Sequence, residues 1–261
     1  MKKIITFVMT LTAVFSMASA QISQGNPHSS NIRTGNRPQA GNWGVFIGPS
    51  YSELRDLIDW IDDAGNIDIV RGLPLINVKH YNTDNLEMRL GLQFYSKSYR
   101  GSGKAFGTGD KVNFKNAASF FRLTPGMAYH FSSKNLLDVY TGCYIPLGYE
   151  SYTNSNKTGT VTRSLQHGSM VFGVGAYIGL QAFVADLPLS IGLEYGLEGL
   201  LHLGDVDKME AVDAAGDKQI SYDRAGDGTF GGIGPYKDLS ATTNAIGTSL
   251  RVTISYYFSN K

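Results

Sequence analysis

Eight charged residues interrupt segments that otherwise alternate apolar residues with small or polar ones. Four are cations and four are carboxylates, so in one enclosed space they could pair off, or instead line an ion pathway or a proton relay. They are Lys79, Glu87, Arg89, Arg122, Asp138, Glu194, Glu198 and Arg251. Which of these chemistries applies depends on the elements that hold them.

A second group has the residue types of nucleophilic catalysis. Ser169 could be the nucleophile, His167 or His202 the base, and Glu198 the group that orients the base. His167 and Ser169 are two positions apart, so on an extended strand they share a face. That face also carries Gly173, whereas the apolar residues occupy the other. A hydrolase acting on membrane lipid would need its nucleophile on the apolar side, so we predict that the chain is not an enzyme.

The elements that position these residues are predicted to be β-strands. From residue 41 onward the apolar residues recur with a period of two, which indicates strands rather than helices. The clearest case is the last segment, where Ile246 and every second residue up to Phe258 are apolar or threonine. We predict eight such strands, at 41–50, 70–81, 86–98, 117–131, 136–149, 165–184, 189–203 and 242–258.

The predicted connections alternate in length. Three are short and rich in turn-forming residues: 82–85, 132–135 and 185–188. The other four are about 15 to 40 residues long. Short turns at one end and long loops at the other are typical of outer-membrane barrels, with the turns in the periplasm and both termini on that side. This pattern predicts an all-β fold, an eight-stranded antiparallel up-and-down transmembrane β-barrel over residues 41–261.

Two other folds compete with this interpretation. Residues 168–185 contain no charge and could form a transmembrane helix, but Gly173, Gly175 and Gly179 share one face of a strand, as a crowded interior would require. A soluble lipocalin-like barrel also has eight strands, but its apolar residues would face inward. Here the alternate face carries the mid-strand charges, so the simpler arrangement places charges inside and apolar residues against lipid.

The N-terminal residues predict export. Lys2 and Lys3 precede an apolar run, and Ala18-Ser19-Ala20 provides a cleavage pattern, so we predict a signal peptide at 1–20, cleaved after Ala20. Residues 21–40 are polar and are predicted to form a flexible leader. The 23 basic and 22 acidic residues nearly cancel, which implies no nucleic-acid partner. Cys143 is the single cysteine and is expected to face lipid.

In strand number, loop asymmetry and the terminal strand RVTISYYF (251–258), residues 41–261 resemble the small outer-membrane β-barrels of the OmpA/OmpX type. Such barrels commonly end in an aromatic residue that the barrel-assembly machinery reads, and Phe258 fits that role. The resemblance implies insertion into the outer membrane, with lipid and this machinery as partners. It implies no single activity.

Two loops are candidates for specificity. Residues 51–69 have apolar residues at helical spacing, and Leu57, Trp60 and Ile61 are the predicted contacts for a partner protein. The loop 204–241 is rich in aspartate and glycine, which could bind calcium but is more typical of a solvated loop.

Eight strands close around an interior that side chains can fill, so the eight charges are predicted to plug the barrel rather than to conduct. We therefore expect a closed, non-enzymatic outer-membrane barrel that serves envelope integrity or loop-mediated adhesion. No cofactor and no metal site is predicted. The alternative is a subunit of an export or uptake complex, and a lipid-modifying enzyme is a lesser alternative.

Overall fold

The computed structural model describes residues 37–48, 75–131, 137–184 and 187–258. These residues form eleven strands in one antiparallel sheet. The strands are β1 (Trp43–Gly48), β2 (Leu75–Tyr81), β3 (Leu86–Lys104), β4 (Lys111–His130), β5 (Leu137–Tyr144), β6 (Leu147–Thr158), β7 (Val161–Phe183), β8 (Leu189–Leu203), β9 (Val206–Val212), β10 (Lys218–Arg224) and β11 (Thr242–Phe258). Within the same ranges, no helix is long and apolar enough to cross a membrane. The predicted signal peptide and residues 21–36 of the predicted leader lie outside the described residues.

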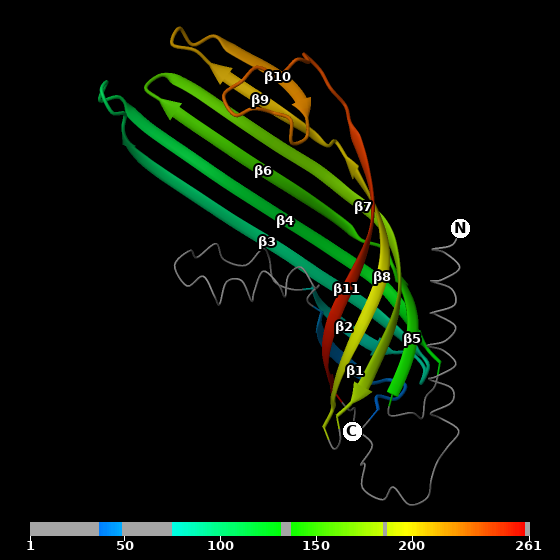
Figure 1. Ribbon diagram of the computed structural model, residues 1–261. Coiled ribbons are helices and arrows are strands. Elements are labelled where there is room, and N and C mark those ends of the chain that lie inside the picture. Colours follow the sequence, from blue (N-terminus) through cyan, green and yellow to red (C-terminus); the bar gives the residue numbers. More distant parts are fainter. Residues whose placement is uncertain (1–36, 49–74, 132–136, 185–186, 259–261) are drawn as a thin grey trace, which may run out of the picture.

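The strand pairings return on themselves. β1 pairs with β2 on one side and with β11 on the other. From β2 the order runs through β3, β4, β5, β7 and β8 back to β11. The pairings therefore form a closed ring through eight strands, which occupies the lower part of Figure 1. The all-β, antiparallel, up-and-down order predicted from the sequence is confirmed.

Strands β5 and β6 are two parts of one line of chain. Tyr144 faces Gly126 and Leu147 faces Leu123, so the register with β4 is the same on both sides of the interruption. Pro146 has no N–H to donate, and the ladder is broken there, although its carbonyl still accepts from Gly173 N at 3.0 Å. The eight predicted segments thus correspond to the eight positions of the ring.

Side chains on the ring alternate strictly between its two sides. On β8 the residues Ser190, Gly192, Glu194 and Gly196 are buried, whereas Ile191, Leu193, Tyr195 and Leu197 are exposed. Because the charged face is the buried one, the lipocalin-like alternative is wrong. The helical alternative for 168–185 is also wrong, because residues 168–183 lie in β7.

Glycines on the inner side of the strand ring leave space for aromatic side chains. A Cβ on Gly175 would lie 2.2 Å from Cζ of Tyr144, and one on Gly179 would lie 2.2 Å from Cζ of Tyr140. These tyrosines pack with Tyr177 into a buried cluster. The prediction that Gly173, Gly175 and Gly179 of β7 face a crowded interior is confirmed.

The first two corrections concern predicted long loops that are largely strand. β3 and β4 continue past the predicted ends and are joined by residues 105–110, and β6 and β7 are joined by residues 159–160. Gly159 has a φ of 59°, which suits so tight a turn. The loops were predicted because these stretches are polar on both faces and lack the alternation that marks a half-buried strand.

The third correction concerns residues 204–241, predicted as one long loop. They contain the hairpin of β9 and β10, and β9 pairs with residues 162–167 of β7. Together with the outer parts of β3, β4, β6 and β7, this hairpin forms a sheet that projects beyond the ring (Figure 1). We call residues 95–120, 150–169 and 206–224 the extension.

Candidate functional site

The most heavily charged part of the ring interior is contributed by four strands. Lys79 lies on β2, Glu87 and Arg89 on β3, Asp138 on β5 and Glu194 on β8, and all five side chains are buried. They share the interior because each occupies the inward parity of its strand. Buried charges are stable only when they are paired, so their contacts determine what the site can do.

Arg89 is at the centre of this network. Its Nε donates to Oε1 of Glu87, and its Nη1 donates to Oε1 of Glu194 at 2.5 Å. Tyr140 OH donates to the same oxygen of Glu194 at 2.9 Å. Lys79 Nζ lies 3.6 Å from Oε2 of Glu87. The guanidinium also lies 4.9 to 5.1 Å from three ring centroids, those of Phe46, Tyr140 and Tyr177.

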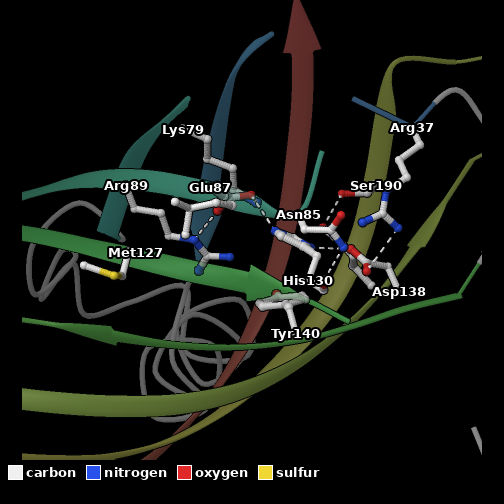
Figure 2. A network of polar contacts seen from close by, with 12 residues as sticks. Arg37, Lys79, Asn85, Glu87, Arg89, Met127, His130, Asp138, Tyr140 and Ser190 are labelled. Atoms are coloured by element: carbon white, nitrogen blue, oxygen red, sulfur yellow. Dashed lines mark hydrogen bonds and ion pairs between the residues drawn. The ribbon is translucent and has the colours of Figure 1, made fainter. Parts of the chain in front are cut away.

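His130 connects this cluster to a second one. Its Nδ1 lies 2.6 Å from Oδ2 of Asp138, and its Nε2 lies 3.4 Å from Oε2 of Glu87 (Figure 2). The imidazole is fully buried, and its backbone is held by Asn85, whose Nδ2 donates to the His130 carbonyl at 2.6 Å. The contacts therefore run without a break from β5 through β4 to β3 and β8.

Asp138 is the centre of the second cluster. Arg37 Nη1 lies 3.1 Å from its Oδ1, and Gln181 Nε2 donates to its Oδ2 at 2.7 Å. Ser190 and Tyr257 both donate to the side-chain oxygen of Gln181 at 3.1 Å. Arg37, Lys79 and Arg89 face Glu87, Asp138 and Glu194, so three cations balance three carboxylates around His130.

Three of the eight predicted residues form no ion pair with this network. Arg122 and Glu198 form their own ion pair at 3.5 Å, with about a sixth of each side chain exposed. The guanidinium of Arg251 lies 5.7 Å from the ring centroid of Tyr144, and no carboxylate of the described residues is within ion-pair distance of it. The other five are brought together.

Sequence reasoning missed several members of the network. Arg37 fell in the predicted flexible leader, yet its neighbours are held as well, with Ala40 N donating to Asp84 Oδ1 at 2.9 Å. His130 was not among the eight predicted interior charges. Its parity, opposite to that of Tyr129 and Phe131, already placed it inside. No sequence signal marked Arg37.

The candidates for catalysis lie near the other end of the ring and do not form a triad. Ser169 Oγ donates to the carbonyl of Leu203 at 3.4 Å. The His167 ring lies between Asp207, 3.2 Å from Nδ1, and Asp205, 3.6 Å from Nε2. His202 Nδ1 lies 2.8 Å from Oε1 of Glu150 instead of contacting a hydroxyl.

The aspartates of residues 204–241 stabilise turns. Asp207 Oδ2 accepts from the backbone N–H groups of Gly226 at 2.9 Å and Gly228 at 3.3 Å, and Asp213 Oδ1 accepts from Asp217 N at 2.8 Å. Leu57, Trp60 and Ile61, the predicted contacts for a partner protein, lie outside the described residues.

No family model matches the chain, and no curated protein matches it. Among solved structures it is similar to a major outer membrane protein from Thermus thermophilus. The sequence identity is 14%, the TM-score is 0.40, and the match covers 84% of this chain and 100% of that one. A likeness of this size supports no conclusion about function, which has to be argued from the geometry of the chain itself.

Proposed function

We propose that this chain is an exported, closed, non-enzymatic β-barrel of the outer membrane, which crosses the membrane with its ring and presents the extension at the cell surface. The observation that carries the proposal is that the apolar side chains of the ring are exposed while its charged side chains are buried. Leu90, Val174 and Leu193 are 49, 62 and 50% exposed, whereas Lys79, Glu87 and Asp138 are 1, 0 and 0% exposed. A belt of exposed apolar side chains around a charged interior is what hydrocarbon surroundings require.

Aromatic residues at the turn end of the ring support the same proposal. Trp43, Tyr129, Phe131, Tyr256 and Phe258 are all exposed. Trp43 lies opposite Phe258, and Tyr129 and Phe131 contact each other edge to face. Such rings settle at the boundary between lipid and water, which would place the short turns in the periplasm and the extension outside.

The cysteine offers a direct test of membrane insertion. Cys143 points outward from β5, between the outward-facing positions of Thr141 and Ile145 in the belt. In lipid vesicles we expect it to react with a lipid-soluble maleimide but not with a charged, water-soluble one. The matched control is Cys143→Ser combined with Ser98→Cys, which moves the thiol to the exposed outer face of β3 in the extension and should restore reaction with the charged reagent. Equal labelling of both thiols by the charged reagent would contradict insertion.

The closed interior is the second part of the proposal. A cavity of about 20 Å³, lined by Arg89, Glu194 and Arg251 among others, is large enough for about one water molecule. Around it the network of Arg89, Glu87 and His130 occupies the bore. We expect purified protein in planar bilayers to give no stable conductance. Reproducible ion-selective steps would show that the network is a pathway and not a plug.

The extension favours a role in which the protein binds other molecules at the cell surface. It presents two broad sheet faces away from the belt, on a scaffold that the ring holds rigid. The absence of enzymatic activity is proposed because the Ser169 hydroxyl donates to a backbone carbonyl, while His167 and His202 contact carboxylates and not this hydroxyl.

A further inference from the structure

The outward face of the extension carries a cluster of cations. It consists of Arg100, Lys104, Lys111, Lys115 and Lys157, of which Lys115 is half-buried and the others are exposed. Residues 93–120 and 147–163 contain only two carboxylates, Asp110 in the turn after β3 and Glu150, which contacts His202. The chain as a whole has a net charge of only +1, so this concentration is local.

The strand register places like charges beside one another. Arg100 lies opposite Lys115, Lys104 lies opposite Lys111, and Lys157 faces Asn113, two positions from Lys115. Like charges directly opposite on a sheet destabilise it. None of the five has an ion-pair partner among the described residues. The arrangement therefore lacks a counter-charge of its own and favours binding of an anion.

Three of the five cations line a shallow surface hollow. Its volume is about 640 Å³, and Arg100, Ser102, Asn113, Lys115 and Lys157 are among its lining residues. Three cations and neighbouring hydroxyl and amide groups converge on one depression. Phosphate groups are recognised by such a combination of charge and hydrogen-bond donors.

The cluster continues the outward face of the apolar belt. The pairings of β3 with β4 keep one register from Leu86 to Lys104, so Arg100 points to the same side as Leu92 and Phe94. On this face, Ser96 and Ser98 lie between Phe94 of the belt and Arg100 of the cluster. The six residue steps from Phe94 to Arg100 span about 20 Å along the strand, and less in depth because barrel strands are tilted. In Figure 1 these strands lean away from β8 and β11.

From this placement we infer that the cation cluster binds the phosphate groups of the anionic glycolipid in the outer leaflet. The inference rests on the proposed function, because it requires the belt to lie in the outer membrane. Acyl chains would contact the belt while the phosphates of the same lipid reach the hollow above it. The cluster would then hold the inclined extension close to the membrane surface.

The test compares lipid binding by the full chain and two triple variants. Purified protein in neutral detergent is mixed with bis-phosphorylated lipid A, captured by a tag and assayed for retained lipid. Arg100→Gln, Lys115→Gln and Lys157→Gln together should weaken retention at least about tenfold at 0.15 M salt, and salt should weaken the binding of the parent chain. The control changes Arg163→Gln, Arg224→Gln and Lys237→Gln, which removes the same charge from exposed sites elsewhere and should leave retention unchanged.

Three outcomes would overturn the inference. Equal loss in both triple variants would mean that net charge alone attracts the lipid. Equal retention of dephosphorylated lipid A would mean that the belt binds the acyl chains without the cluster. Displacement by millimolar inorganic phosphate would make free phosphate the ligand. Labelling of Cys143 in vesicles is scored separately, so failure of insertion is distinguishable from failure of lipid recognition.

Discussion

The ring and the extension are built largely from the same strands, yet they are stabilised in different ways. Along β3, the residues from Glu87 to Leu90 alternate between buried charged and exposed apolar side chains, whereas those from Ser96 to Arg100 are all exposed. In the ring, a side chain meets either hydrocarbon or a packed, charged interior. Where β3 and β4 project beyond the ring, most side chains on both faces reach water.

This difference determines what each region can tolerate. In the ring, a lost ion-pair partner leaves a charge that neither lipid nor the packed interior can solvate. In the projecting parts of β3 and β4, water can replace a lost side-chain contact, and stability depends on backbone hydrogen bonds and cross-strand pairs of modest energy. Changes of the same chemical kind should therefore have large effects in the ring and small ones outside it.

The largest effect is expected at Glu194. Glu194→Leu removes one of the two carboxylates of Arg89 and the acceptor of Tyr140, so the free energy of unfolding should fall by about 3–5 kcal/mol. The urea midpoint of the folded protein in detergent measures this. The control is Glu210→Leu in the extension, which breaks the ion pair with the half-exposed Lys218 at 2.9 Å and should cost about 1 kcal/mol or less. Equal shifts in the two variants would mean that Glu194 is solvated too.

An intermediate effect is expected where glycine meets an aromatic ring. Gly179→Ala places a methyl group against the fully buried Tyr140, and such overpacking should cost about 1–3 kcal/mol. Gly103→Ala is the matched change in the extension, because a Cβ there meets no atom within 4 Å. Its urea midpoint should stay near that of the parent chain. A destabilisation by Gly103→Ala as large as that by Gly179→Ala would contradict the contrast between the regions.

The smallest effect is expected from shortening the extension. Arg100 and Lys115 are paired in the ladder, so residues 101–114 can be replaced by Asn-Gly, which forms a two-residue hairpin turn. The urea midpoint should change by less than about 0.5 kcal/mol in unfolding free energy, because loop tips tolerate such changes. A marked loss of stability would show that the extension supports the ring.

Several features could be predicted from the sequence because one physical cause dominates them. Ile246 to Phe258 and Leu189 to Leu197 alternate because one face meets apolar surroundings and the other does not, and the structure confirms both as strands. The same parity placed Glu87, Arg89 and Glu194 inside. Residues 99–104 of β3, 111–116 of β4 and 150–158 of β6 lack that cause, and they were therefore predicted as loops.

The sequence by itself determined the period of two, the segments that face an apolar environment and the balance of four cations against four carboxylates. Only the tertiary structure decided which charges meet. Arg122 and Glu198 form their own pair, and Arg37 and His130 complete the network around Asp138. The parity of a residue in its strand specifies which side of the sheet its side chain is on, but not its position along the axis of the ring. The position along the axis depends on the register between strands distant in sequence, which side-chain packing sets when the ring closes.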